Sequence, residues 1–238
     1  MPAFRLSALA TSSLLLGFLA AACVTPQGAK APRVQAASQA GAAAANAAAS
    51  ERGRMWRATV VVENARGHGS GVIIGQGRIL TAYHVAEQGG LQIEYYGGER
   101  TAGRVGWSSP SLDLAVIETA VPRRYRASSL FCGEIAVDQH LVAIGHPLTN
   151  RWVLSEGSLR DDLDLGALRP LSFELSQGNS GGPIFDDAGR VVGIASAVLM
   201  LDRVEKTAAE AEAAKAGPRS GIGLMLPASA FCGKLDAA

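Results

Sequence analysis

The sequence predicts an all-β protein with antiparallel strands arranged as barrels or a sandwich. Short apolar runs recur along the chain, and no amphipathic helical pattern alternates with them. The 238 residues include 28 glycines and 10 prolines, which supply turns between the runs. A parallel α/β sheet needs a helix between successive strands, so the pattern favours antiparallel pairing. The runs are 59–62, 71–74, 91–95, 114–117, 140–144, 153–154, 171–173, 191–198 and 221–226.

The first 22 residues have the pattern of an export signal. Arg5 precedes an apolar run at 14–19, which is too short for a comfortable membrane span. The stretch Leu19-Ala20-Ala21-Ala22-Cys23 resembles the lipobox of bacterial lipoproteins, although such signals more often have leucine where Ala20 stands. The resemblance implies cleavage before Cys23 and lipid on its sulfur, whereas an ordinary secretory cleavage site is the alternative. We therefore predict export to the periplasmic face of the envelope and a membrane anchor through Cys23, and Val24 favours the outer membrane.

Residues 23–55 are rich in alanine and poor in bulky apolar side chains. Gly41 and Asn46 interrupt the alanine run, and no apolar stripe marks a face that would dock on a core. The composition predicts a flexible tether between the signal and the folded region.

The stretch Gly178-Asn179-Ser180-Gly181-Gly182-Pro183 presents a serine in a glycine-rich turn before an apolar run. A serine hydroxyl becomes a useful nucleophile only beside a base, and acyl transfer also needs N–H groups that bind an oxyanion. Gly178 is free to adopt the backbone angles that aim an N–H at a reacting carbonyl. The simpler alternative is a glycine turn that only joins two strands.

A candidate base and a candidate carboxylate lie upstream of this serine. His84 ends the apolar run 79–82, and Asp113 stands at the start of the apolar run 114–117. A carboxylate near a core needs a partner, and Asp113 would find one in the Nδ1–H of His84. Taken singly, each residue is as easily explained by a surface histidine or a turn aspartate.

His84, Asp113 and Ser180 occur in the order of a known family. The chain resembles trypsin-like serine peptidases of the chymotrypsin fold, and among them the bacterial HtrA and DegP branch. The matching stretches are 69–74, 80–85, 113–116, 143–147, 178–183 and 221–227.

The resemblance implies two six-stranded antiparallel β-barrels with the active site in the cleft between them. We expect the first barrel at 56–121, and the linker, second barrel and tail at 122–238. The implied catalytic residues are His84, Asp113 and Ser180, and the implied oxyanion hole is formed by Gly178, Asn179 and Ser180. We expect no PDZ domain, a departure from the usual HtrA pattern.

The residues that would bind the substrate follow from position. Glu174 lies six residues before Ser180, where enzymes that cleave after Lys or Arg have a carboxylate at the floor of the pocket. Leu175 would instead wall off Glu174, and a strand residue facing solvent is the plain alternative. Ser196 and Ala197, on the next strand, are expected along the substrate backbone.

The remaining features are a pair of cysteines and two segments expected to be helical. Cys132 and Cys232 form an even pair in an exported protein once Cys23 carries lipid, which favours a disulfide over two buried thiols. Residues 202–217 have the signals of a short helix, which would be either a lid or an inert insertion. Residues 228–237 are expected to form a short terminal helix.

The net charge of +1 provides no basic field for nucleic acid. His68, His140 and His146 lack ligand spacing for a metal, although the position of His68 beside an opening strand of the first barrel leaves that residue open. No cofactor is implied. The sequence therefore predicts a serine endopeptidase that acts on polypeptides, with a trimer conceivable from the HtrA resemblance. The alternative from another class is a catalytically silent or latent module of the same fold that binds peptides in the envelope.

Overall fold

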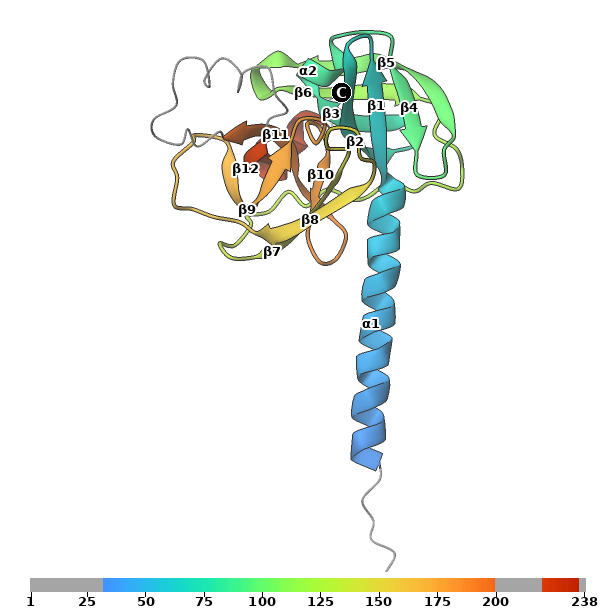
Figure 1. The fold of residues 1–238 in the computed structure, drawn as a ribbon, viewed down its shortest axis with the longest axis vertical. Coiled ribbons are helices and arrows are strands. Elements are labelled where there is room, and N and C mark those ends of the chain that lie inside the picture. The colour runs from blue at the N-terminus through green and yellow to red at the C-terminus, as the bar shows by residue number, and fades with distance from the viewer. Residues whose placement is uncertain (1–31, 200–219, 236–238) are drawn as a thin grey trace, which may run out of the picture. The chain divides into compact units, whose positions relative to one another are not determined.

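The computed structural model describes residues 32–199 and 220–235, which form mainly two six-stranded antiparallel β-barrels (Figure 1). The first is closed, with the strand order β1-β2-β3-β6-β5-β4. Its strands are β1 (Thr59–Asn64), β2 (Gly67–Gly75), β3 (Arg78–Ala82), β4 (Gln92–Tyr95), β5 (Arg100–Ser109) and β6 (Leu114–Thr119). These strands lie within residues 56–121.

The first barrel closes because β1 pairs with β2 on one side and with β4 on the other. Small residues allow the strands to approach. A Cβ placed on Gly103 would lie 2.5 Å from Cγ2 of Ile117, so only glycine fits there without movement of the core. The β5–β6 register shifts between Val105 and Trp107, and such a bulge bends the strand around the barrel.

The second barrel has the strand order β8-β7-β10-β11-β12-β9. Its outer strands meet at an antiparallel bridge between Leu159 and Leu171, which brings the two edges of the sheet together. The strands are β7 (His140–Gly145), β8 (Val153–Ser158), β9 (Arg169–Ser176), β10 (Pro183–Phe185), β11 (Val191–Leu199) and β12 (Ser220–Pro227).

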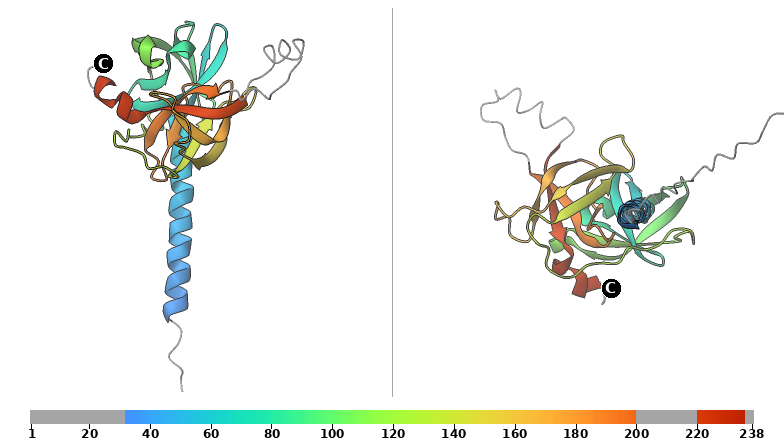
Figure 2. Two further views of the ribbon diagram at one scale, coloured as in Figure 1. Left: turned by 90° about the vertical axis from the view of Figure 1, so that its left-hand side faces the viewer. Right: turned by 90° about the horizontal axis from the view of Figure 1, so that it is seen from below.

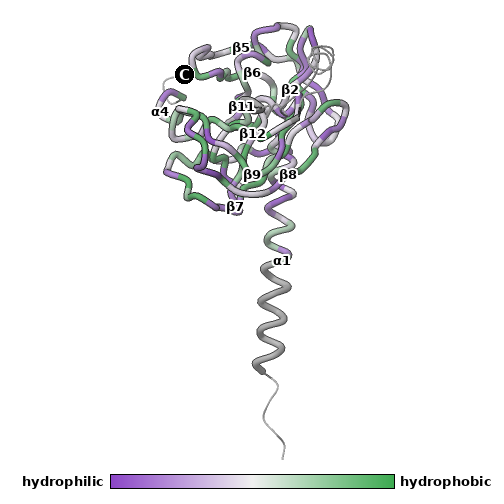
Figure 3. Tube along the Cα trace, turned by 60° about the vertical axis from the view of Figure 1, so that its left-hand side comes forward, coloured by the Kyte–Doolittle hydropathy of each residue, from purple (hydrophilic) through white to green (hydrophobic). Residues whose placement is uncertain are grey.

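Three clusters of buried apolar side chains form the core. One fills the first barrel and one fills the second. The third lies between them and joins Val72 and Leu80 of the first barrel to Ile144 and Phe185 of the second. The apolar stretches of the trace in Figure 3 run along the strands, as expected when alternate residues of each strand point into a core. The two barrels therefore pack against each other through a shared apolar cluster.

Helix α1 (Pro32–Ala58) lies where the sequence predicted part of a flexible tether. Alanine has the highest helix propensity, and one Gly41 costs only about 1 kcal/mol relative to alanine. Met55 and Ala58 are each 2 % exposed and belong to the cluster between the barrels, so packing holds the end of the helix. The hydroxyl of Thr59 also donates a hydrogen bond to the Met55 carbonyl, at 2.9 Å. The part of the predicted flexible tether at residues 32–55 is thus helical, and its role as a link to the signal stays a prediction.

By its internal contacts the chain divides into two compact units, residues 1–41 and 42–238. Among the described helices, none combines the length and the apolar character that crossing a bilayer requires. The predicted signal, Cys23 and the predicted helix at 202–217 fall outside the described residues.

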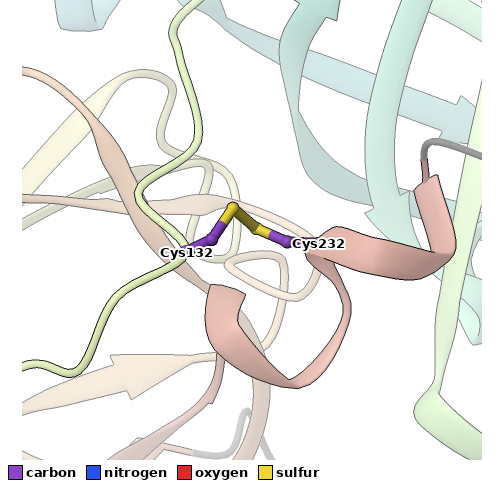
Figure 4. Close-up of a disulfide and its surroundings, with 2 residues drawn as sticks. All are labelled: Cys132 and Cys232. Carbon is purple, nitrogen blue, oxygen red and sulfur yellow. A yellow bond between two sulfur atoms is a disulfide. The ribbon is translucent and has the colours of Figure 1, made fainter.

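A disulfide joins Cys132 and Cys232, with the two sulfur atoms 2.00 Å apart (Figure 4). Cys132 lies in the segment before β7, and Cys232 begins α4 (Cys232–Leu235). The short 3-10 helix η2 (Ala228–Ala230) precedes α4, so the single terminal helix expected at 228–237 is divided in two. Both helices follow β12 at the C-terminal end of the described chain (Figure 2).

Candidate active site

The three predicted catalytic residues lie in loops at the ends of strands from both barrels. His84 belongs to α2 (Tyr83–Ala86), directly after β3, and Asp113 lies between the 3-10 helix η1 (Pro110–Leu112) and β6. Strands β3 and β6 are paired with Ala82 opposite Leu114, which brings the two loops together. The Tyr83 N–H also donates to the Asp113 carbonyl at 3.0 Å. Ser180 comes from the loop between β9 and β10 of the second barrel.

His84 and Asp113 form a close pair. The Nδ1 atom of His84 lies 2.8 Å from Oδ2 and 2.9 Å from Oδ1 of Asp113, and the His84 backbone N–H donates to Oδ1 at 3.0 Å. The hydrogen bond that His84 Nδ1–H donates to Asp113 raises the pKa of His84 above its usual 6.5, although burial opposes the shift. With Nδ1–H donating to the carboxylate, the neutral ring keeps Nε2 as an acceptor.

Asp113 itself has an unusual backbone. Its φ is +52°, in the left-handed region that aspartate tolerates better than most residues. The hydroxyl of Ser196, on β11, donates to Oδ2 of Asp113 across 3.4 Å, a long hydrogen bond. The sequence analysis assigned Ser196 only to the substrate backbone, because nothing in the spacing of the two residues indicates this contact.

The Ser180 loop is a tight turn followed by several anchored residues. The Asn179 N–H donates to the Ser176 carbonyl at 3.0 Å, and Gly178 has φ of +98°. This combination is a type II β-turn, in which the third residue needs positive φ. Beyond it, the Gly181 N–H donates to the Ala195 carbonyl at 2.7 Å. The carbonyl of Ser180 accepts from the Ser70 N–H at 2.8 Å, which ties the loop to the first barrel.

Two N–H groups of this turn remain available. Within the part of the chain that the structure describes, neither the Gly178 N–H nor the Ser180 N–H donates a hydrogen bond. The Asn179 N–H is used by the turn, so Asn179 differs from the sequence-based expectation that it contributes to the oxyanion hole. The Gln177 carbonyl accepts from the Leu148 N–H at 2.8 Å, and in a trans peptide this turns the Gly178 N–H to the opposite side.

Ser70 braces the same turn from the first barrel. Its Oγ donates to the Gly178 carbonyl at 2.7 Å and accepts from the His146 N–H at 3.1 Å. The hydroxyl is buried, so both bonds are shielded from water. The His146 carbonyl packs so closely that a Cβ on Gly178 would lie 2.3 Å from it. Sequence analysis missed this role of Ser70, for which the flanking glycines were the only signal.

His146 lies behind the brace and is fully buried. Burial lowers the pKa of His146 to about 3, so the ring is neutral at ordinary pH. Its Nδ1 accepts from the Trp152 N–H at 3.0 Å, and the Trp152 ring meets it edge-on at 4.9 Å. Its Nε2 is buried and makes no hydrogen bond within the described structure.

The candidate specificity residues lie on both faces of β9 and on β11. Glu174 is exposed, whereas Leu175 is 2 % exposed and belongs to the core of the second barrel. A carboxylate that stays in contact with water binds a cationic side chain more weakly than one at the floor of a desolvated pocket. Ser196 is half-buried, and Ala197 pairs with Leu224 in the sheet.

The His84–Asp113 pair and Ser180 are not joined by a hydrogen bond in the described structure. The His84 side chain is 45 % exposed, so its ring borders open solvent. The described residues also contain no cluster of three or more histidine, cysteine or acidic side chains arranged to hold a metal ion.

Comparison with known proteins agrees with this geometry. The sequence model of the family described as trypsin-like peptidase domain matches residues 69–194, more than half of the chain. A protein of Brucella suis called probable periplasmic serine endoprotease DegP-like is 30 % identical over 142 residues, which cover 55 % of this chain and 28 % of the relative. The chain thus spans well under half of that relative's length.

Solved structures show the same fold. The serine endoprotease from Yersinia pestis superposes with a TM-score of 0.65 at 22 % identity, over 80 % of this chain and 65 % of that one. The HtrA-type protease AlgW, solved with a tripeptide, gives a TM-score of 0.65 at 23 % identity, over 80 % and 62 % of the two chains. With its two antiparallel barrels and its matched sequence, the chain belongs to the trypsin-like peptidase family.

Proposed function

We propose that this protein is a serine endopeptidase that cleaves polypeptides through an acyl-enzyme intermediate. One observation carries the proposal: the His84–Asp113 pair stands beside a turn in which the N–H groups of Gly178 and Ser180 are free. The buried hydrogen bond from Ser70 to the Gly178 carbonyl holds this turn in place, as expected if its N–H groups bind a developing negative charge.

In the proposed mechanism, Ser180 Oγ attacks the scissile carbonyl while His84 Nε2 takes its proton. Asp113 holds the Nδ1–H tautomer and stabilises the imidazolium, and the N–H groups of Gly178 and Ser180 bind the oxyanion. His84 then returns the proton to the leaving amine. Water attacks the resulting ester by the same steps in reverse order, which frees Ser180.

The proposed location is outside the cytoplasm. The relative from Brucella suis is called periplasmic, and residues 1–22 have the pattern of an export signal. We propose that Cys23 carries lipid and anchors the protein to a membrane. A disulfide between Cys132 and Cys232 agrees with an oxidising compartment. We also propose that the protein assembles into oligomers, by its resemblance to HtrA proteins. A direct measurement of its mass in solution tests this.

A latent enzyme is the second candidate, and the missing His84–Ser180 hydrogen bond favours it. Catalytic hydrogen bonds are often long before substrate binds, so the gap is compatible with activity. A latent enzyme would close the gap only after a partner or a peptide binds.

Reaction with a fluorophosphonate separates these candidates. The full chain should be labelled at Ser180, as read by mass spectrometry, and Ser180→Ala should not be labelled. His84→Ala should react far more slowly, whereas Ser158→Ala, a surface serine on β8, should react like the parent protein. Absence of labelling in a folded sample would favour the latent module, and labelling that appears only after peptide is added would favour activation by ligand.

A further inference from the structure

A pocket rich in arginine lies where α1, the linker between the barrels and the β10–β11 turn meet. Its volume is about 280 Å³, and none of the proposed catalytic residues lines it. The lining includes the arginines 54 and 57 of α1 and the arginines 124 and 126 of the linker, together with Glu51, Ser128, Ser129 and Gly189. Four guanidinium groups around one small space repel one another unless negative charge is present.

The protein neutralises only part of this charge. Glu51 pairs with Arg54, and Glu99 pairs with Arg124. Arg126 donates to the Arg123 carbonyl at 2.9 Å, which leaves its charge unmatched. Arg57 makes no ion pair or hydrogen bond within the described part of the chain. Four positive charges less two carboxylates leave two uncompensated positive charges.

The other carboxylates of this region are already bound elsewhere. Asp186 is 3 % exposed, accepts hydrogen bonds from the N–H groups of Ala188 and Arg190, and pairs with the Arg190 side chain. Asp187 pairs with His140 at 2.6 Å. Neither acid lines the pocket, so the charge must be balanced by solvent ions or by a ligand.

The chemistry of the lining indicates which ligand fits. Guanidinium groups bind phosphate oxygens in bidentate pairs, and the hydroxyls of Ser128 and Ser129 donate no hydrogen bond within the described structure. A phosphate monoester carries about two negative charges at neutral pH, which equals the uncompensated charge. We propose that this pocket binds a phosphate group, with Arg57 and Arg126 as its principal ligands.

A second pocket adjoins the first and has a different character. Its volume is about 760 Å³, it shares Arg126 and Ala127 with the arginine pocket, and Ile73, Val121 and Pro122 contribute apolar walls. The organic part of a phosphate compound would lie there. The phosphate therefore comes either from a membrane phospholipid or from a soluble phosphate compound, and experiment distinguishes the two.

The first test is calorimetric titration of the full chain with inorganic phosphate at low ionic strength. The double variant Arg57→Ala/Arg126→Ala should weaken binding at least tenfold. The matched control Arg52→Ala/Arg104→Ala removes the same charge from arginines outside the pocket that pair with Glu156 and Glu118, and it should bind like the parent protein. Lysine at both pocket positions keeps the charge but loses the bidentate geometry, so binding should be intermediate.

The second test uses sedimentation with vesicles that contain phosphatidic acid, whose headgroup is a phosphate monoester, compared with vesicles of phosphatidylcholine alone. If the parent protein and the control bind the anionic vesicles and the pocket variant does not, the ligand is a phospholipid headgroup. Phosphate binding without vesicle binding identifies a soluble compound. The proposal is overturned if the parent protein binds neither probe, or if pocket variant and control lose binding equally. Circular dichroism and thermal unfolding establish that each variant is folded.

Discussion

The pKa of His84 links the proposed catalytic pair, His84 and Asp113, to the pH dependence of the proposed activity. Histidine acts as a general base only when its ring is neutral, and the hydrogen bond that His84 donates to Asp113 raises the pKa of His84 above 6.5. We therefore expect kcat/KM for a peptide substrate to fall as pH drops through a midpoint above 6.5. Asp113→Asn should lower kcat by about 10⁴-fold, as loss of the orienting carboxylate does in related triads, and should move the midpoint downward. Measurements of kcat/KM between pH 5 and 9 test both effects. An unchanged midpoint in the variant would contradict the pairing of His84 with Asp113.

Ser70 offers a test of the brace behind the oxyanion turn. Its hydroxyl does not face the substrate, so Ser70→Ala should lower kcat and leave KM nearly unchanged. The loss of hydrogen bonds worth about 1 kcal/mol each corresponds to a decrease of roughly 5- to 30-fold. Ser158→Ala, which removes a surface hydroxyl, is the control. A rise in KM without a change in kcat would instead mean that Ser70 acts on substrate binding.

The sequence predicts which residues belong to the candidate site better than it predicts the contacts between them. The register of β3 and β6 brings His84 beside Asp113, as the motif order led us to expect. The contacts of Ser70 with Gly178, and of Ser196 with Asp113, cross 108 and 83 residues of sequence and have no local signature. The occupied N–H of Asn179 depends on one turn conformation, which composition does not specify.

Among the elements, most strands were predictable and the helix was not. Strands such as β1, β7 and β11 coincide with apolar runs of the sequence, whereas β5 contains no such run and was not predicted. Helix α1 was missed because its alanine run has no apolar stripe, and the buried residues that anchor it, Met55 and Ala58, lie in its last turn. Closure of the second barrel through Leu159 and Leu171 also depends on contacts between distant strands.

Met55 tests whether that last turn contributes to the stability of the whole fold. Its side chain is buried in the cluster between the barrels, so Met55→Ala should lower the free energy of unfolding by about 2–5 kcal/mol. Urea denaturation followed by tryptophan fluorescence measures the loss. Arg54→Ala, on an exposed position of the same helix, should change it by less than about 0.5 kcal/mol. Equal effects would mean that α1 is not docked on the core.

For the molecule as a whole, His146 predicts sensitivity to acid. The pKa of His146 is lowered to about 3 in the folded protein, so between pH 6.5 and 3 the unfolded chain binds a proton that the folded chain does not. Stability should therefore fall as pH drops below 6.5, by several kcal/mol in total. His146→Gln should flatten this part of the curve in thermal unfolding scans. His84 acts in the opposite direction, because its raised pKa stabilises the fold at low pH and this contribution is lost as pH rises through that pKa.

The disulfide should contribute to global stability. Cys132 and Cys232 are 100 residues apart, and closing a loop of that size is worth about 4–5 kcal/mol by chain entropy. Replacing both cysteines by serine should lower the midpoint of thermal unfolding by several degrees or more. The same shift should follow when reductant is added to the parent protein, and no shift in either case would mean that the bond does not constrain the unfolded chain.

The bond between Cys132 and Cys232 also determines how damage to this protein becomes visible. A single cut of the backbone anywhere between these positions, whether made by a contaminating protease or, under the proposed function, by a second copy of this protein, leaves two pieces that remain covalently joined. Such a nicked molecule keeps its full mass and enters a non-reducing gel as one band. Only reductant separates the fragments, so purity and self-cleavage must be judged on reduced samples.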